Sequence, residues 1–594
     1  MKQFQKVGLA AAVATVAAGT VAQPDSAVSR TETGDLAIIP YYTVLDGTNT
    51  GMHIINTTDS TQVVKVRLRR GTDSKDALDF NLVMSPRDEW TANIGPGGAN
   101  GVLVTTNDTT CTVPAFPEGG APMPDTYSEG ATEGYVEVIA MAETIDEDQP
   151  IAVAAKHKDG VPADCSAVRQ NFYRVAEASV ATGSVRGTHT SNLTSNGVCK
   201  TAAATGACKA GVAANLSNFQ DSDDNAMKVS FMLTDPTGGL EAGDNAVMVE
   251  GFADAAMMTN QQPLSFGTDG VLNFDPLNFE LPSLAYGAFA SSNTTRQAAG
   301  AAAGDSMTDG SMWNSLADAL DADSIANDWA SFSTADGTVS ADWVVTLPGQ
   351  YVMTNPVCDI YEGYTQATIT AVVICNGAAA QTTAGMAAGL DDIEAAYSAA
   401  GGDDRNQLPL IVSSSFIGDA LTESNLNLWD REEMALAGED VEPVDPPDDL
   451  GFSPGGATGT EPGDRTDILL MNEVNVIAFG GEDATTAVMS NLKLEVDVGD
   501  AVDRGWGRLD IVSSNATPML WSLTGTDDGD VDAAAAGLDA GVLLGAPSAF
   551  TAVDDATDVA VVGFALWERS FAAQAGNYGR MIEHSTITSG SASR

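Results

Sequence analysis

Acidic side chains gather around one tryptophan in the segment "NLNLWDREE". Trp429 is followed by Asp430 and Arg431, and then by Glu432 and Glu433. Glycoside hydrolysis uses two carboxyl groups, and an aromatic ring beside them can stack on the sugar. A catalytic acid also needs burial to raise its pKa, whereas this segment leads into a polar loop rich in proline and glycine. We therefore interpret Asp430, Arg431 and Glu432 as a structural ion-pair site at a loop entrance, and we assign no catalytic residue.

Two further acidic turns suit a hard cation, because carboxylate oxygens closely spaced along a turn can surround calcium. The candidate metal ligands are Asp527, Asp528, Asp530 and Asp532 in "TDDGDVD", and Asp221, Asp223 and Asp224 in "DSDD". The first turn is not an EF-hand, since Asp532 stands where that loop needs its glycine. We predict calcium as a cofactor and expect no organic cofactor; a solvated turn is the alternative at each place.

The sequence contains few motifs that would indicate other kinds of catalysis. The chain has 4 histidines, and none belongs to an H-E-x-x-H zinc motif. There is no Walker lysine and no glycine-rich dinucleotide loop. A hydrolytic triad that uses one of the histidines is an alternative that we do not favour.

Charge limits the partners more strongly than any motif does. The 594 residues include 81 Asp+Glu against 27 Lys+Arg, which gives a formal net charge of −54. Nucleic-acid binding needs basic patches, and anionic lipid surfaces attract basic segments, so neither partner is expected. The acidity is compatible with divalent cations, with a saline habitat or with colloidal repulsion.

Most of the chain has the pattern of short β-strands separated by polar turns. In "VVKVRLRR", apolar and basic residues alternate with a period of two, which is typical of a half-buried antiparallel strand. Val64, Val66 and Leu68 belong to one face, and Lys65, Arg67 and Arg69 belong to the other. We predict a mainly β protein with antiparallel β-sandwich regions, Ig-like or Greek-key-like, and long loops between strands.

One segment breaks this pattern and predicts a small helical insertion. In "SMWNSLADALDADSIANDWASF", apolar residues recur at three- and four-residue spacing, including Leu316, Leu320, Ile325 and Trp329. We therefore divide the chain into an N-terminal β-sandwich region, a helical insertion and a C-terminal β-sandwich region. The predicted ranges are 31–300, 301–340 and 341–594, and a single large sandwich split by insertions is the alternative.

The first residues have the pattern of a secretory signal peptide. Lys2 and Lys6 precede a run of small apolar residues, and Thr20 and Ala22 fit a small-x-small cleavage site. The apolar run is shorter than a membrane-spanning helix requires. We expect residues 1–22 to be removed from an exported protein that has no segment inserted in a membrane.

Six cysteines in an exported chain predict disulfides, because an oxidising compartment removes free thiols. Closure of sequence-local loops favours pairing between neighbours in the sequence. The predicted bonds are Cys111 to Cys165, Cys199 to Cys208, and Cys358 to Cys375.

Several blocks of the chain resemble an uncharacterised group of exported proteobacterial proteins associated with the cell surface. The blocks include "GDLAIIPYYTV", "DWVVTLPGQYV", "LWDREE", "FSPGG", "MNEVNVIAF" and "YGRMIEHS". They extend over most of the chain after the signal peptide. The resemblance implies export and one β-rich architecture, and it transfers no functional residue.

These observations favour a non-enzymatic structural protein of the cell surface or extracellular space, of the surface-layer or matrix type and stabilised by cations. Its partners would be copies of itself or other envelope components. A secreted carbohydrate-binding or adhesive protein is the alternative, because exposed tryptophan and tyrosine can supply sugar platforms. A carboxylate-dependent glycoside hydrolase is the least favoured function.

Overall fold

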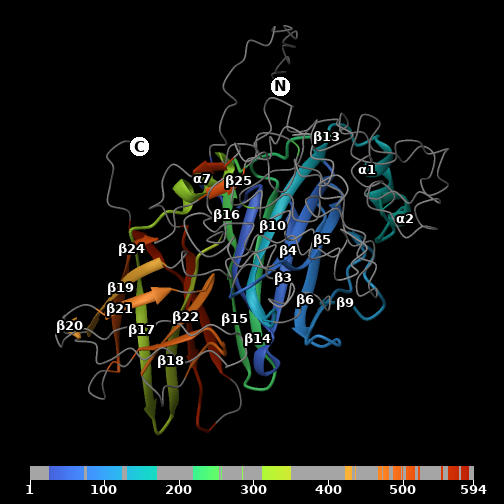
Figure 1. Cartoon of the computed structure of the whole chain (residues 1–594). Coiled ribbons are helices and arrows are strands. Elements are labelled where there is room, and N and C mark those ends of the chain that lie inside the picture. Colours follow the sequence, from blue (N-terminus) through green and yellow to red (C-terminus); the bar gives the residue numbers. More distant parts are fainter. Residues whose placement is uncertain are drawn as a thin grey trace, which may run out of the picture.

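The computed structural model of this chain consists mainly of antiparallel β-strands arranged in sandwich-like sheets, as the sequence predicts (Figure 1). Three short α-helices occur among the residues that the structure describes. The described residues are 26–72, 76–123, 130–169, 219–252, 256, 284, 311–348, 422–430, 435–436, 466–470, 472–480, 486–496, 498, 503–514, 519–521, 550–552, 560–573 and 577–587.

The first half of the chain forms two antiparallel sheets, here called sheet 1 and sheet 2. Sheet 1 has the order β1 (Ala27–Val28), β16 (Val247–Glu250), β2 (Leu36–Thr43), β10 (Glu133–Thr144), β4 (Gln62–Arg70), β5 (Asp76–Met84) and β8 (Cys111–Val113), and β13 (Phe219–Gln220) also pairs with β10. Sheet 2 has the order β15 (Leu240–Asn245), β14 (Met227–Asp235), β3 (Asn49–Asn56), β6 (Glu89–Pro96), β7 (Val102–Thr105) and β9 (Ala121–Pro122).

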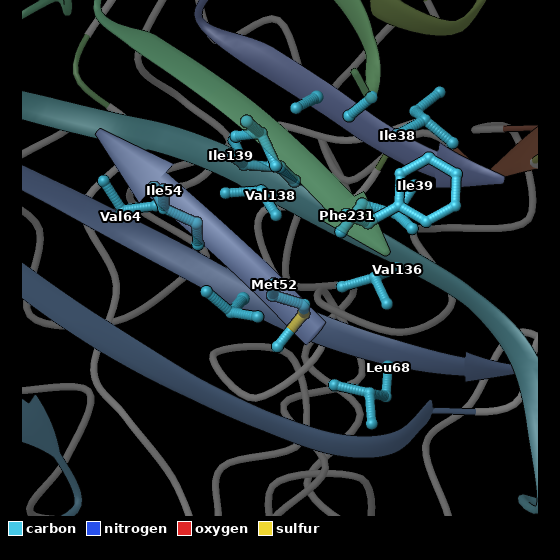
Figure 2. Close-up of a cluster of buried hydrophobic side chains, with 14 of the residues drawn as sticks. Ile38, Ile39, Met52, Ile54, Val64, Leu68, Val136, Val138, Ile139 and Phe231 are labelled. Carbon is cyan, nitrogen blue, oxygen red and sulfur yellow. The ribbon is translucent and has the colours of Figure 1, made fainter. Parts of the chain in front are cut away.

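The two sheets enclose a hydrophobic core, as the strand alternation requires. Figure 2 shows Met52 and Ile54 of β3 and Phe231 of β14 in one cluster with aliphatic side chains of β2, β4 and β10. Val64 and Leu68 of β4 are part of that cluster, and both are fully buried. The prediction that this face of β4 is apolar and buried is therefore confirmed.

The opposite face of β4 is not solvated, so the half-buried assignment of this strand is wrong. Lys65 and Arg67 are 0% exposed and Arg69 is 1% exposed. Lys65 Nζ lies 2.6 Å from Asp79 Oδ2 on β5, and Arg69 Nε lies 2.9 Å from Glu137 Oε1 on β10. Because neighbouring strands present carboxylates at matching positions, the basic row can be buried as ion pairs.

The second half forms one eleven-stranded sheet, here called sheet 3. Its main path is β20 (Ala435–Leu436), β19 (Thr422–Asp430), β24 (Arg504–Ser514), β17 (Ser324–Thr334), β18 (Gly337–Thr346), β22 (Val474–Phe479) and β23 (Lys493–Val496). Four strands branch from it: β21 (Thr466–Leu470), β27 (Val562–Arg569), β28 (Tyr578–Glu583) and β29 (Ser585–Ile587). Two isolated pairs complete the described strands: β11 (His157–Lys158) with β12 (Val161–Pro162), and β25 (Met519–Trp521) with β26 (Phe550–Ala552).

Sheet 3 folds over itself around a second hydrophobic core. We call β19, β24 and β17 its outer arm, and β27, β18 and β22 its inner arm. Leu428 and Leu509 of the outer arm share this core with Trp343 and Phe479 of the inner arm. The hairpin from β17 to β18 joins the two arms, which gives the second half a sandwich-like form within one hydrogen-bonded sheet.

The inner arm also packs against the first half. Val344, Val476 and Phe564 belong to the core cluster of sheets 1 and 2, and the rings of Phe564 and Phe231 lie 5.8 Å apart between centroids. The hydroxyl of Thr346 donates to the carbonyl of Pro40, and Val474 N–H donates to the carbonyl of Gly71. The two halves therefore share one continuous core, although their strands come from separate parts of the chain.

The helical insertion is half confirmed. A helix, α7, occupies Ser311–Leu320, but the residues that follow it form strand β17. The predicted continuation of the helix through Ile325 and Trp329 is wrong. A spacing of four residues fits one face of a strand as well as one face of a helix, so the pattern alone could not distinguish them.

The other two helices, α1 (Pro150–Ala155) and α2 (Cys165–Arg169), lie at the edge of the first half (Figure 1). The predicted disulfide from Cys111 to Cys165 is confirmed, and it joins β8 to α2. The other four cysteines and the predicted signal peptide lie outside the described residues. Within the described part of the chain, no helix has the length and apolar character to cross a membrane.

Candidate functional site

The outward face of the outer arm carries a pair of stacked tryptophans. Trp429 of β19 and Trp506 of β24 are directly opposite in the antiparallel register. Their rings lie 4.2 Å apart between centroids with 13° between the planes. Trp506 is 41% exposed, whereas Trp329 and Trp343 are fully buried in the second core. The pair therefore presents an indole surface to solvent on a sheet whose other face is already packed.

Polar side chains continue the same face along both strands. Asn427 lies two residues before Trp429, and it is paired in register with Arg508. Asp510 Oδ2 accepts hydrogen bonds from Asn427 Nδ2 and Arg508 Nη2, both at 2.9 Å. Arg508 Nε lies 2.6 Å from Asp510 Oδ1, so the guanidinium meets both carboxylate oxygens. The aromatic pair is thus bordered by a connected row of donors and acceptors.

Two glycines in "RGWGRLD" allow β24 to approach β19 and the side chain of Trp343 closely. A Cβ at Gly505 would meet the carbonyl oxygen of Trp429 at 1.8 Å. A Cβ at Gly507 would meet the side chains of Leu428 and Trp343 at 2.7 and 3.0 Å. Glycine at these inner positions permits the close strand approach that brings the two indoles together on the outer face.

The structure places only part of the predicted "LWDREE" site. Asp430 ends β19 and is half-buried, while Arg431, Glu432 and Glu433 lie outside the described residues. The predicted ion-pair site among them stays a prediction. Sequence reasoning missed the partner that matters for Trp429, because Trp506 is distant along the chain and only the strand register brings the two rings together.

The predicted metal ligands are also only partly described. Asp223 and Asp224 are exposed in the turn between β13 and β14, and Asp223 Oδ1 accepts the N–H of Asn225 at 3.0 Å. Asp527, Asp528, Asp530 and Asp532 lie outside the described residues. In the described ranges, no group of three or more His, Cys, Asp or Glu side chains is arranged to hold a metal ion. Calcium binding stays a prediction.

Two buried carboxyl groups, one from each half, hold the loop between β22 and β23. Asp342 Oδ2 accepts the N–H groups of Ala487 and Val488 at 2.6 and 2.9 Å. Burial raises the pKa of Asp342 to about 7. Asp342 lies on β18 of the inner arm, so its hydrogen bonds fix this loop to the second half.

The first half holds the same loop through Glu133 of β10. Glu133 Oε2 accepts the hydroxyls of Ser490 and Tyr41 at 2.6 and 2.9 Å, and Glu133 Oε1 accepts the N–H of Asn491 at 2.8 Å. Burial raises the pKa of Glu133. Neither Glu133 nor Asp342 was identified from the sequence, since nothing in the local pattern distinguishes them from surface acids.

A hydroxyl, imidazole and carboxylate meet near the disulfide and resemble the parts of a hydrolytic triad. His157 Nδ1 lies 3.2 Å from Ser85 Oγ and 3.5 Å from Asp88 Oδ2, and His157 Nε2 lies 3.3 Å from Thr109 Oγ1. A triad needs its nucleophile and its acid on opposite ring nitrogens, which Ser85 and Asp88 do not satisfy. The hydroxyl of Thr109 donates to the carbonyl of Gly160, so these contacts tie surface loops together. The segment "GFSPG", which has the letters of a nucleophile elbow, lies outside the described residues.

His584 is the most deeply buried histidine in the described part of the chain. Its Nε2 lies 3.0 Å from the carbonyl oxygen of Val344, and its Nδ1 lies 2.9 Å from Asn327 Nδ2. Burial lowers the pKa of His584 to about 4, so the ring is neutral at ordinary pH. A neutral ring bonded on both nitrogens inside the fold is a structural contact that joins β17 and β18 to the residue between β28 and β29.

An open cavity of about 920 Å³ lies where β1 and the end of α7 meet β27 and β28. Four acids line it: Glu250, Asp318, Asp321 and Glu583. Burial, with Asp323 and Asp318 nearby, raises the pKa of Asp321. Arg30 and His584 also line the cavity, and both ring nitrogens of His584 already have partners inside the fold.

No family model, no curated protein and no solved structure matches the chain.

Proposed function

We propose that this chain is an exported, non-enzymatic structural protein of the cell surface or extracellular space, whose copies associate laterally through an acidic, cation-bridged surface. The observation that carries this proposal is the continuous core that unites both halves of the molecule. A lattice or matrix subunit has to transmit force through its body without its halves separating. One shared core and the carboxylate of Glu133, which is bonded across the junction to Ser490 and Asn491, are suited to that task.

The ionisable groups support the same proposal by the way they are used. Glu133, Asp342 and His584 have shifted pKa values because they are buried, and all three are bonded to other parts of the fold. Shifted pKa values at a catalytic site normally accompany a cleft that admits substrate. Here each of these groups holds backbone or side-chain partners inside the protein.

Charge provides the means of association. At physiological ionic strength, repulsion between surface carboxylates is screened only beyond about 8 Å, so a net charge of −54 opposes close contact between copies. Divalent cations shared by carboxylates of adjacent copies would remove that repulsion. The predicted signal peptide and the resemblance to exported surface proteins support an extracellular location.

The test has two arms on the mature protein. Cell fractionation followed by electron microscopy of the envelope should find an abundant surface protein or a regular array. Light scattering should be measured in EGTA, in millimolar CaCl2 and in NaCl of equal ionic strength. Larger particles should form only in CaCl2. A sparse monomer in the medium, with the same particle size in CaCl2 and NaCl, would contradict the proposal.

A further inference from the structure

The outward face of the outer arm combines an exposed tryptophan ring with a row of hydrogen-bonded polar side chains. We propose that this face binds a neutral polysaccharide, with the ring of Trp506 as a stacking platform and the row of Asn427, Arg508 and Asp510 as hydrogen-bonding partners. The inference is independent of the structural role proposed above, since it rests on this face alone. Carbohydrate binding was an alternative from the sequence, and the geometry points to where it occurs.

The exposure of Trp506 is the first argument. A tryptophan buries a large apolar area when it is used for packing, and leaving it 41% exposed gives up part of that stabilisation. The core does not need this ring, because Leu509 on the inner face of the same strand is fully buried there. Trp429 stacks on Trp506 and holds it in one orientation. A rigid exposed indole loses little conformational entropy when a ligand stacks on it.

The polar row is the second argument. The carboxylate of Asp510 holds Arg508 and Asn427 in place, so the row is preorganised. Arg508 has five N–H donors, more than the carboxylate engages, and its side chain is 39% exposed. Adjacent donors and acceptors next to an apolar platform match a sugar ring, which has hydroxyls at its rim and C–H groups on its face.

Charge and shape narrow the class of ligand. Asp328 of β17 is exposed directly opposite Trp506, and the chain as a whole carries a charge of −54. An anionic polysaccharide would be repelled from this face, so a neutral one is expected. Small ligands bind in concave pockets, whereas this site is the face of a sheet. An extended chain that crosses the strands fits a flat face better than a monosaccharide does.

Binding by the mature protein can be measured by pull-down on insoluble cellulose and chitin and by affinity electrophoresis in mannan, laminarin, dextran and alginate. At least one neutral polysaccharide should retain the protein, and anionic alginate should not. Trp506→Ala should weaken that retention by at least about tenfold, as truncation of a central tryptophan does at other binding sites. Arg508→Gln should weaken it by a smaller factor.

The matched control is Tyr578→Ala, which removes another exposed aromatic side chain from the second half, at a position on β28. It should bind as the wild type does, and circular dichroism and melting should show that all variants are folded. The proposal is overturned if no neutral polysaccharide retains the wild type, or if Trp506→Ala binds as the wild type does. It is also overturned if Trp506→Ala instead abolishes a concentration-dependent dimer, since the face would then cover a second copy of the chain.

Discussion

Strands β4 and β24 have the same alternating sequence character, and the protein uses them in opposite ways. β4 places Lys65, Arg67 and Arg69 on one face, and all three are buried. β24 places Trp506, Arg508 and Asp510 on one face, and this face meets solvent. In both cases the other face packs into a hydrophobic core. Alternation therefore determines which residues share a face, while the surroundings of the strand decide whether that face is solvated.

The energetic consequences of the two rows differ as well. An ion pair buried without solvent is costly to form, but removing one partner leaves an uncompensated charge in a medium that cannot solvate it. An exposed pair such as Arg508 with Asp510 contributes little to stability, because water and salt screen it. The buried row should therefore be sensitive to mutation in folding, and the exposed row should be sensitive in binding.

The largest effect is expected at Glu137, whose carboxylate meets both Arg67 and Arg69. Glu137→Gln keeps the size of the side chain and removes its charge. The free energy of unfolding should fall by about 3–5 kcal/mol, as measured by urea denaturation. The exposed acid Glu241, changed to Gln in the same half of the molecule, is the control and should unfold as the wild type does. A loss below about 1 kcal/mol at Glu137 would mean that the row is solvated after all.

The disulfide gives a second test of the first half, the half in which the charged row of β4 is buried. Its cysteines are separated by 54 residues in the sequence. Replacing Cys111 and Cys165 together by serine should lower the free energy of unfolding by about 2–4 kcal/mol, because the unfolded chain is less constrained. Non-reducing peptide mapping of the wild type should recover the linked peptides. Polysaccharide retention should be unaffected, since the proposed binding face is in the second half.

Asp342 predicts a pH dependence whose sign can be given. Its pKa in the folded state is about 7, above its ordinary value of 3.8, so its stabilising contribution is present below pH 3.8 and is lost as the pH rises through about 7. Between pH 5 and pH 7 this change amounts to about 2–3 kcal/mol. His584 acts in the opposite sense, because its contribution is present above pH 6.5 and is lost as the pH falls through about 4.

The variant Asp342→Asn isolates the first of these effects. An amide oxygen can still accept the N–H groups of Ala487 and Val488, but it does not titrate. Relative to the wild type, the variant should become more stable as the pH rises from 5 to 7. Asp336→Asn changes an exposed acid in the turn of the same β17–β18 hairpin, and it should leave the pH profile unchanged. Parallel profiles for wild type and Asp342→Asn would show that the carboxyl does not titrate in this range.

The smallest effect on folding is expected in the exposed row. Asp510→Asn removes the charge that Arg508 faces, yet the side chain of Arg508 is 39% exposed and keeps access to water. The free energy of unfolding should change by less than about 1 kcal/mol. Thermal melting of Asp510→Asn and Glu137→Gln under the same conditions compares the two variants directly. A large loss of stability at Asp510 would show that the two rows are energetically alike.

Local sequence patterns were sufficient for much of the secondary structure. The period of two in β4 identified a strand and its apolar face, and the sequence-local pairing of Cys111 with Cys165 was predicted correctly. These features depend on neighbours within a few residues, or on the entropy of closing one loop. The spacing that predicted α7 continued into β17, where the same residues serve a strand because β24 and β18 are available to pair with it.

The candidate site could not be located in this way. Trp429 was visible beside its acidic neighbours, but its stacking on Trp506 depends on the register of β19 with β24. The roles of Glu133 and Asp342 depend on one loop that lies between the two halves.

The sequence by itself determined the strand-rich class, the excess of negative charge and the alternating faces, because these are properties of composition and of short periods. Only the tertiary structure decided which charged face is covered and which aromatic ring is exposed. The physical reason is that burial depends on what packs against a strand from elsewhere in the chain. An arginine on β4 finds carboxylates on β5 and β10 and can be buried with them, whereas the equivalent arginine on β24 lies on a face that stays open to water.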